Sequence, residues 1–457
     1  MPQPKDTTAQ LGTDAVWRLI ARFSIPSIIS MSVAAIYNVV DRFFIGRYVD
    51  ERALGGLTVA FPFMMLMFAV GALIGIGGST LISIRFGEQK KEQAHLIFGN
   101  MVALSALSSL GLAILGTIFI TPLLRLMGAT PNNLGYAVEY MRVILIGLIF
   151  QLPSFAMAAL ARVEGRPRLA MATQMIAGVS NIFLDYLFIV PLRWGVTGAA
   201  LATILGQFLG FAILVWHFFF SGRSLLRLYR QNLRLQTEIV RAIGAIGASS
   251  FFMQMGTSVS SAMFNTALAS YGGDEAISSL GAMSSLFTLA LMPILGLQQG
   301  LGPIIGYNHG LKRSDRVWRA LILGIGIGSA FAATVFLAVE LWPTTFASLF
   351  IDKNSPTMAM CVHGMRINFL MLPLLSVNVI GSTYFQSTAQ SLKAFVLSVS
   401  RSVIFLIPCV LILPPIFQLN GVWMSAPTAD FLSISLTFAL LLHSAATARG
   451  KEKAGLI

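Results

Sequence analysis

The sequence predicts an all-α polytopic membrane protein with twelve transmembrane helices, arranged as two parallel-repeat bundles of six. Three observations lead to this prediction: the composition, the continuous apolar segments and an internal repeat. Of the 457 residues, 56% are apolar and 11% charged, and the mean hydropathy is +0.78. Soluble domains have about 45–50% apolar and about 25% charged residues. So few charges cannot cover a water-facing surface. Disorder and nucleic-acid binding are therefore poor interpretations, despite the net charge of +13.

Apolar segments long enough to cross a bilayer occur twelve times. A transmembrane helix needs about 20 predominantly apolar residues, and most of these segments contain no charge. The first and fifth each carry one aspartate, and the eleventh carries Arg401. No short apolar segment with a small-residue cleavage site precedes the first span, so this span is expected to be retained. The predicted spans are 23–41, 53–84, 96–124, 143–161, 169–192, 194–222, 242–273, 276–311, 320–339, 367–390, 394–413 and 431–448.

The distribution of basic residues predicts the orientation of these spans. If the N-terminus is cytoplasmic, 23 of the 31 lysines and arginines fall in the N-terminal segment, the even-numbered connections and the C-terminal segment. Cytoplasmic loops of membrane proteins carry an excess of lysine and arginine. Both termini are therefore expected in the cytoplasm.

The second half of the chain repeats the first at a shift of 223 residues. The matches are sparse but fall at span ends and tight packing positions. They include Leu57 with Leu280, Gly77 with Gly300, Ile82 with Ile305, Gly87 with Gly310, Lys90 with Arg313 and Gly198 with Gly421. Because six spans are an even number, both halves enter the membrane from the same side, as in parallel repeats with a substrate path between them. The predicted domains are an N-terminal six-helix lobe (1–222), a cytoplasmic linker (223–241) and a C-terminal six-helix lobe (242–457).

The linker is predicted to form an amphipathic helix. Arg223, Arg227, Arg230 and Arg234 follow one another at spacings of four, three and four residues, which would place them on one helix face. Anionic lipid would hold such a helix at the cytoplasmic interface.

Two acidic residues stand out because they belong to apolar spans. A charged Asp41 or Asp185 in the membrane costs about 2.5–3.5 kcal/mol or more. Burial in apolar surroundings disfavours the ionised carboxylate, so either group could take up and release a proton near neutral pH. This is what a proton-coupled carrier requires. The alternative is that one or both are polar groups that pack helices or lie at the interface.

Polar neighbours recur one helical turn from these acids. Tyr37 lies four residues before Asp41, Asn181 lies four residues before Asp185, and Thr203 and Gln207 have the same spacing on the sixth span. Residues four apart share a helix face. If the faces converge, they bring together hard oxygen ligands suited to a proton or Na⁺. Asn181 and Thr203 could instead be ordinary interhelical hydrogen-bonding residues.

Other polar and special residues are less informative. Asp430 precedes the last predicted span, where it is either a second ionisable site or an aspartate favoured at a helix N-terminus. Pro26 and the other prolines within spans bend their helices. The five histidines and two cysteines have no metal-ligand spacing, and no nucleophile or phosphate loop is evident. An enzyme and a bound cofactor are therefore not expected.

These features together resemble the multidrug and toxic compound extrusion (MATE) transporters over nearly the whole chain. The residues that carry the resemblance are Pro26, 37–41, 44–46, 164–167, 181–186, 195–203, 306–310, 421–423 and Pro427 with Asp430. The resemblance implies two six-helix lobes, alternating access, an inward H⁺ or Na⁺ gradient, and lipophilic, often cationic drugs or dyes as substrates. The expected location is the cytoplasmic (inner) membrane of a bacterium.

The resemblance is strongest to the DinF-like and MepA-like branch. In that branch the cation site lies in the N-terminal lobe, and its residues fall here on Asp41, Asn181, Asp185 and Thr203, the proposed site for a proton or Na⁺. Tyr37, Gln207 and Pro26 are the expected supporting residues. The NorM-like branch also uses acids in spans seven and ten, which here have none.

Two other functions remain open at this point. A lipid-linked saccharide flippase of the wider superfamily would need basic residues in the central cavity, and Arg401 is the visible candidate. A channel or a non-transporting sensor is the other alternative. The expected partners are small drugs or dyes and membrane lipid but no nucleic acid, and the protein is expected to act as a monomer.

Overall fold

The computed structural model describes residues 8–453 apart from 50, 352–354 and 356. Lys5, counted above among the cytoplasmic basic residues, lies outside them. All regular elements in this part of the chain are helices, as the sequence predicts. The N-terminal half contains α1 (Ala9–Thr13), α2 (Val16–Tyr48), α3 (Glu51–Gly87), α4 (Lys91–Ile118), α5 (Ile120–Leu126), α6 (Leu134–Val163), α7 (Pro167–Ile189), α8 (Gly195–Val215) and the π-helix η1 (Trp216–Phe220).

The C-terminal half contains two helices that are each broken within their length. Gly273 interrupts α9 with a φ of 63°, and Gln418 interrupts α15 with a φ of 53°, so each holds two successive spans. The remaining elements are short or one span long. The elements are η2 (Arg230–Leu233), α9 (Thr237–Gly310), α10 (Ser314–Leu341), α11 (Pro343–Ala347), α12 (Thr357–Asn368), η3 (Leu372–Leu374), α13 (Leu375–Ser387), α14 (Ser391–Val399), η4 (Ser400–Phe405, a π-helix) and α15 (Leu406–Lys453).

Among the residues that the structure describes, eleven helical segments are long and apolar enough to span a membrane. The last of them covers residues 391–447, which includes the eleventh and twelfth predicted spans. Its interruption at Gln418 divides it between the two. The twelve predicted spans thus correspond to helices in the structure, but several boundaries differ. The tenth begins at Thr357 rather than 367, and the helix predicted for 431–448 already runs through Asp430.

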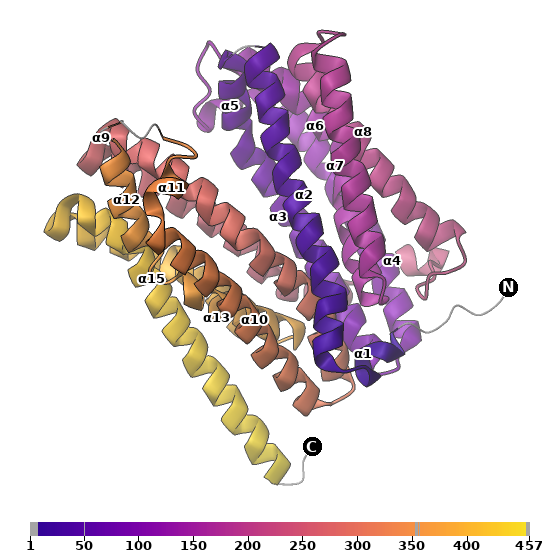
Figure 1. Cartoon of the computed structure of the whole chain (residues 1–457). Coiled ribbons are helices and arrows are strands. Elements are labelled where there is room, and N and C mark those ends of the chain that lie inside the picture. The colour runs from indigo at the N-terminus through magenta and orange to yellow at the C-terminus, as the bar shows by residue number, and fades with distance from the viewer. Residues whose placement is uncertain (1–7, 50, 352–354, 356, 454–457) are drawn as a thin grey trace.

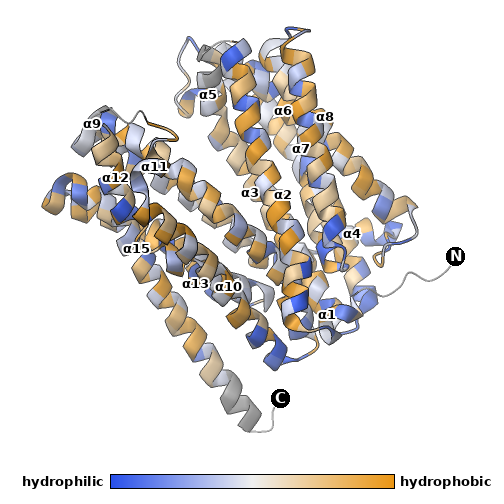
Figure 2. Ribbon diagram, in the orientation of Figure 1, coloured by the Kyte–Doolittle hydropathy of each residue, from blue (hydrophilic) through white to orange (hydrophobic). Residues whose placement is uncertain are grey.

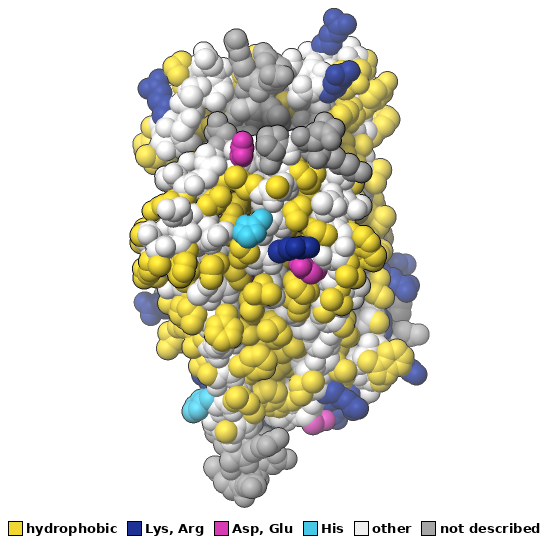
Figure 3. Space-filling view, turned by 60° about the vertical axis from the view of Figure 1, so that its left-hand side comes forward, with side chains coloured by type: hydrophobic (Ala, Val, Ile, Leu, Met, Phe, Trp, Pro, Cys, Tyr) yellow, Lys and Arg dark blue, Asp and Glu magenta, His cyan; other side chains and the backbone are white. Residues whose placement is uncertain are grey.

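The two halves form two helical bundles that meet at one end and separate at the other (Figure 1). Helix α1 and the last described part of α15 lie towards the end where the bundles meet, which we call the closed end. Hydrophobic residues run along the helices of both lobes (Figure 2). The outer face of the C-terminal lobe is largely hydrophobic, with most basic side chains towards its upper and lower edges (Figure 3). This distribution suits a protein surrounded by lipid.

Three clusters of buried apolar side chains form the core. One belongs to the N-terminal lobe and includes Phe63 and Leu148. A second belongs to the C-terminal lobe and includes Trp423. The third crosses between the lobes and includes Phe23 and Ile304. The lobes therefore share a core on one side and have separate cores elsewhere, in agreement with the V shape of the molecule.

Glycines allow the lobes to approach closely in equivalent ways. A Cβ on Gly77 of α3 would lie 2.2 Å from the carbonyl oxygen of Ile243, on α9. A Cβ on Gly300, the repeat equivalent of Gly77, would lie 2.8 Å from the Cα of Ser24 on α2. Each lobe thus uses a glycine of its second span to pack against the first span of the other lobe, as parallel repeats require.

The prediction of an amphipathic helix in the linker is wrong. Between η1 and α9 the described chain forms only the short 3₁₀-helix η2, so Arg223, Arg227 and Arg234 lie in non-helical backbone. Side chains of the N-terminal lobe bind the linker backbone instead. Asn100 donates to the carbonyl oxygen of Asn232 at 3.2 Å and accepts from the backbone N–H of Gln236 at 2.7 Å. These bonds replace the hydrogen bonds that a helix would make.

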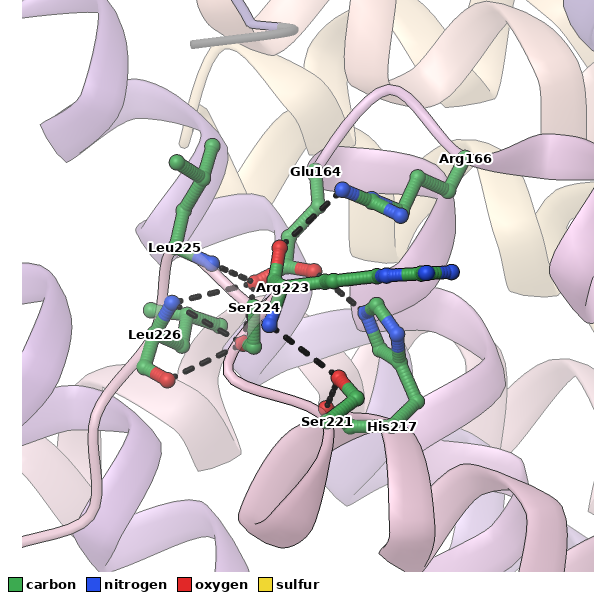
Figure 4. Close-up of polar contacts among 8 residues, drawn as sticks. All are labelled: Glu164, Arg166, His217, Ser221, Arg223, Ser224, Leu225 and Leu226. Atoms are coloured by element: carbon green, nitrogen blue, oxygen red, sulfur yellow. Dashed lines mark hydrogen bonds and ion pairs between the residues drawn. The ribbon is translucent and has the colours of Figure 1, made fainter. Parts of the chain in front are cut away.

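Glu164 forms the principal attachment of the linker (Figure 4). It follows α6 and is completely buried. Its carboxylate accepts hydrogen bonds from Ser224 Oγ at 2.6 Å and from the backbone N–H groups of Leu225 and Leu226 at 2.8 and 3.0 Å. His217 Nε2 lies 3.0 Å from the other oxygen. A buried charge is tolerated only when it is paired and hydrogen-bonded, so Glu164 fixes both the linker and the start of η1.

Candidate functional site

Asp41 and Asp185 lie near each other inside the N-terminal lobe. Asp41 comes from α2 and Asp185 from α7, and their carboxyl groups are close enough to interact electrostatically. Asp185 is completely buried and Asp41 is 7% exposed. Both oxygens of Asp185 and Oδ1 of Asp41 have no hydrogen-bond partner among the described residues. Unsatisfied buried carboxyl oxygens are rare and costly, so this pair requires an explanation.

Asn181 and Thr203 complete the group that the sequence predicts. The Asn181 amide donates to Thr203 Oγ1 at 3.4 Å, and the Thr203 hydroxyl donates to the carbonyl oxygen of Ala199 at 3.1 Å. Both side chains are buried, and the Asn181 carbonyl oxygen is a fourth acceptor without a partner in the described chain. The four predicted residues thus lie together, although their role stays a prediction.

Small residues at the helix contacts allow this convergence. Gly206 of α8 packs against α7, where an added Cβ would lie 2.6 Å from the carbonyl oxygen of Ala177. Gly178 of α7 packs against α2, where a Cβ would lie 2.7 Å from Val33 Cγ1 and 3.4 Å from Tyr37 Cδ1. Close approach of backbones at glycine is typical of membrane helices.

Two tyrosines border the acids. Tyr37 was predicted from its spacing to Asp41 and interacts electrostatically with it. Tyr140, on α6, was not predicted. It is buried, shares a side-chain hydrogen bond with Thr203, and lies near both aspartates. Tyr140 was missed because the fourth span was predicted to begin at 143, whereas α6 begins at Leu134.

A cavity of about 210 Å³ adjoins the acids. Tyr37, Asn181, Thr203 and Gln207 line it, whereas Asp41 and Asp185 are not among its lining residues. The carboxyl groups therefore lie behind the cavity wall. Further polar lining residues that the sequence did not single out are Gln151, Gln174 and Gln299 together with Arg162. Arg162 was assigned to the loop after the fourth span, but it is buried within α6.

Pro26 is not close to the acids along α2. Fifteen residues separate it from Asp41, which is roughly 22 Å at the rise of an α-helix. Its carbonyl accepts a hydrogen bond from Ser30 Oγ at 2.9 Å. Its neighbours Ser24 and Ile28 pack against Gly300 and Gly296 of α9. Pro26 thus lies where the first span contacts the other lobe.

Asp430 has a different environment from the first two acids. It is buried inside α15, and its carboxylate forms an ion pair and hydrogen bond with Arg401 of η4. The Arg401 guanidinium also lies 5.6 Å from the ring centre of Phe287. The prediction that Asp430 opens a helix is wrong, because that helix begins earlier in the chain. An ion-paired carboxylate has its charge compensated locally, unlike Asp41 or Asp185.

The unpartnered groups of Asp41, Asn181 and Asp185 are acceptors rather than donors. Carboxylate and amide oxygens suit a proton or a hard cation such as Na⁺. No group of three or more histidine, cysteine, aspartate or glutamate side chains that could hold a metal ion occurs among the residues that the structure describes. The site around Asp41 and Asp185 is thus suited to the reversible uptake of a proton or a weakly held cation beside a cavity.

Comparison with known proteins gives a consistent assignment. The sequence profile of the MatE family matches residues 26–187 and 249–411. The chain is 26% identical to the multidrug export protein MepA of Staphylococcus saprophyticus over 91% of each chain. It is 24% identical to MepA of Staphylococcus haemolyticus over 93% of this chain and 94% of the relative. A crystal structure described as MATE in complex with MaL6 superimposes with a TM-score of 0.92 at 24% identity, covering 98% of this chain and 99% of the other.

Proposed function

The chain belongs to the MatE family, and from this membership we propose that it is a multidrug efflux antiporter that exports lipophilic or cationic drugs in exchange for protons. Na⁺ is the alternative coupling ion, because the same oxygen ligands fit both. The MepA relatives, which are multidrug export proteins by name, support drug export. The single observation that carries the coupling proposal is the pair Asp41 and Asp185, buried beside a cavity with unpartnered oxygens.

The proposed cycle begins with the wide end of the V facing outwards. The excess of basic residues near the two termini supports a cytoplasmic closed end and hence this orientation. Asp41 and Asp185 then take up a proton or bind Na⁺. This removes negative charge next to the cavity, and the affinity for a cationic substrate falls. The substrate leaves, the loaded protein reorients, and the ion is released inside.

The first span connects ion binding to the contact between lobes. Asp41 lies near one end of α2, and Pro26 lies among the residues that pack against Gly296 and Gly300. Proline removes a helix hydrogen bond and makes bending easier at that point. We propose that neutralising Asp41 shifts the first span near Pro26 and loosens this contact.

The driving force is sufficient for such an exchange. One pH unit supplies about 1.4 kcal/mol per proton, and a membrane potential of 100 mV supplies about 2.3 kcal/mol per elementary charge. Together they can support roughly hundredfold accumulation or more for a net electrogenic step.

The lining of the cavity is compatible with one competing function, the flipping of a lipid-linked saccharide. A lipid-linked saccharide flippase would need cationic groups to meet phosphate. Arg401, the candidate from the sequence, is paired with Asp430, but Arg162 lines the cavity. One guanidinium among glutamines and aromatic residues favours drug export over flipping of a pyrophosphate. The position of Arg162 at the cavity is nonetheless the observation that a flippase would require.

Transport of ethidium in proteoliposomes tests the proposal. Wild type, Asp41→Asn and Asp185→Asn are reconstituted, and either a pH gradient or a Na⁺ gradient is imposed. Wild type should accumulate dye under the pH gradient, whereas both variants should lose gradient-driven transport. Asp185→Asn removes no hydrogen bond in the described part of the protein, so it should fold, and a thermal unfolding midpoint close to that of wild type verifies this.

Glu92→Gln provides a matched control, because Glu92 is an exposed acid at the start of α4. It should transport like wild type. Accumulation of ethidium under the Na⁺ gradient alone would support the same site but identify Na⁺ as the coupling ion. Full pH-driven transport by Asp41→Asn would refute the role of Asp41. Absence of dye transport under either gradient would favour flipping, which a fluorescent-lipid assay would then measure.

A further inference from the structure

A second cavity lies at the closed end, apart from the one described above. It has a volume of about 540 Å³ and is formed by both lobes. The segment before and at the start of α2 contributes Ala15, Val16 and Trp17. The start of α10 and the residue before it contribute the rest of the lining: Arg313, Asp315, Arg316, Arg319 and Leu323. Nothing in the proposed transport cycle uses this cavity.

The charge of the lining is strongly positive. Three guanidinium groups face one carboxylate, that of Asp315. Arg313 and Arg319 both act electrostatically on Arg316, together with Asp14 and Asp315. Three arginines gathered in one cavity repel one another, and an anion bound between them would relieve that repulsion. The positive end of the α10 helix dipole also lies at this cavity and favours the binding of an anion.

Two of the arginines have structural contacts and one does not. Arg313 donates to the carbonyl oxygen of Gly12 at 2.6 Å. Arg316 donates to the carbonyl oxygens of Leu11 and Asp14 and to Asn308 Oδ1. Arg319 is exposed, and no hydrogen bond or ion pair with another described residue is found for it. A guanidinium has five N–H donors, so Arg313 and Arg319 retain donors that can bind a ligand.

The apolar part of the lining indicates where the ligand comes from. Trp17 is 60% exposed, and exposed tryptophan is typical of the membrane–water interface. Val16 and Leu323 belong to membrane-spanning helices. Arg316, Arg319 and Leu323 follow one another at spacings of three and four residues, so they share one face of α10. Along this face, charged side chains are followed by an apolar one. A ligand with an anionic head and an apolar tail matches this order.

The internal repeat argues that the arginines are not merely part of the fold. The positions in the N-terminal lobe that correspond to Arg313, Arg316 and Arg319 are Lys90, Gln93 and Leu96. Lys90 already pairs with Glu88 at 3.0 Å. The position that corresponds to Trp17 is Val240. The same helix connection therefore forms with one basic residue at these three positions in the N-terminal lobe and with three in the C-terminal lobe.

We propose that this cavity is a binding site for the phosphate group of an anionic phospholipid, with the guanidinium groups of Arg313 and Arg319 on the phosphate and Trp17 and Leu323 beside the acyl chains. Arginine binds phosphate through paired N–H donors, and basic pockets between membrane helices bind anionic headgroups. Because the cavity joins α2 to α10, a bound lipid connects the two lobes at their closed end and favours the conformation described here.

Lipid titration of the purified full-length protein in non-ionic detergent tests this site. The midpoint of thermal unfolding is measured against added phosphatidylglycerol, phosphatidylcholine or inorganic phosphate at constant ionic strength. A ligand that binds only the folded state raises this midpoint by an amount that grows with the logarithm of the ratio between ligand concentration and Kd. Phosphatidylglycerol should raise it, and phosphatidylcholine and inorganic phosphate should not. Arg319→Gln should weaken the apparent affinity for phosphatidylglycerol about fivefold, the usual effect of one basic residue at an anionic membrane surface.

Two further variants keep the test decisive. Lys312→Gln removes the same charge in the adjacent turn outside the cavity and should bind like wild type. Arg319→Lys keeps the charge without the paired donors and should fall between wild type and Arg319→Gln. Unchanged affinity in Arg319→Gln, or an equal response to phosphatidylcholine, would overturn the proposal. An equal response to inorganic phosphate would identify a soluble anion as the ligand and overturn the assignment to lipid.

Discussion

Gly87 and Gly310, which are equivalent positions of the two repeats, lie against each other where the lobes meet. A Cβ on Gly87 would lie 2.9 Å from the Cα of Gly310, and a Cβ on Gly310 would lie 3.0 Å from the Cα of Gly87. Each position also faces a carbonyl oxygen of the other lobe, that of Tyr307 or Ile84. The pseudo-twofold axis between the lobes therefore passes close to this pair, and the closed end depends on the absence of side chains there.

Gly310→Ala is expected to weaken the closed end. The added methyl group would lie 2.2 Å from the carbonyl oxygen of Ile84, which cannot move aside as a flexible side chain could. Overpacking of this kind costs about 1–3 kcal/mol, enough to shift a two-state equilibrium about five- to 150-fold. Spin labels at positions 90 and 312, with Cys361 and Cys409 replaced by serine, should report longer and broader distances. Gly326→Ala is the control, because nothing lies within 4 Å of its added Cβ; matching distributions for the two variants would contradict the prediction.

A disulfide across the closed end should arrest transport. Ser83 Oγ donates to the carbonyl oxygen of Pro303 at 3.0 Å, and a Cβ on Gly306 would lie 3.1 Å from Ser83 Cβ. This is close to the Cβ separation of about 3.5–4.5 Å in disulfides. In a background without Cys361 and Cys409, the double variant Ser83→Cys, Gly306→Cys should cross-link on oxidation and lose ethidium transport. Reduction should restore it, whereas Ser83→Cys alone should be insensitive to oxidant. Undiminished transport by the fully cross-linked protein would refute alternating opening at this end.

Glu164→Gln is expected to loosen the linker. The variant loses the charge that accepts hydrogen bonds from Ser224 and from the Leu225 and Leu226 backbone. Hydrogen bonds to charged groups contribute about 1.5–3 kcal/mol. Trypsin should therefore cut after Arg227 or Arg230 at least about tenfold faster than in wild type, because local opening becomes more frequent. Glu92→Gln should be cut at the wild-type rate. Equal rates for all three proteins would mean that Glu164 does not hold the linker.

The sequence was sufficient for the arrangement of the spans and for much of the candidate site. The resemblance to the MATE transporters implied that Asp41, Asn181, Asp185 and Thr203 lie together, and each is a polar group on an apolar helix, where it is expected to face the protein interior. Tyr140 could not be predicted, since its position near Glu139 and Arg142 resembles the end of a loop. The glutamines of the cavity come from α6, α7, α8 and α9, and no local spacing relates them.

The errors share a physical cause. The arginine spacing in the linker favours a helix, but Glu164 and Asn100 bind its backbone in another conformation. The apolar segment that follows Asp430 suggested a helix start there, yet α15 continues through Asp430, whose carboxylate pairs with Arg401 instead of capping a helix. In both places a tertiary contact overrides the local pattern, and such contacts join residues far apart in the chain.

Asp430→Asn should separate a structural acid from a coupling acid. Its carboxylate is paired with Arg401, so the variant leaves a mostly buried guanidinium without its counter-charge. Removing one partner of a buried pair costs about 3–5 kcal/mol, whereas replacing both by apolar residues is often neutral or stabilising. The midpoint of thermal unfolding should therefore fall sharply in Asp430→Asn and recover in the double variant Arg401→Met, Asp430→Leu. The recovered protein should retain pH-driven ethidium transport. If it is stable but uncoupled, Asp430 belongs to the ion pathway, and the N-terminal acids are not sufficient for coupling.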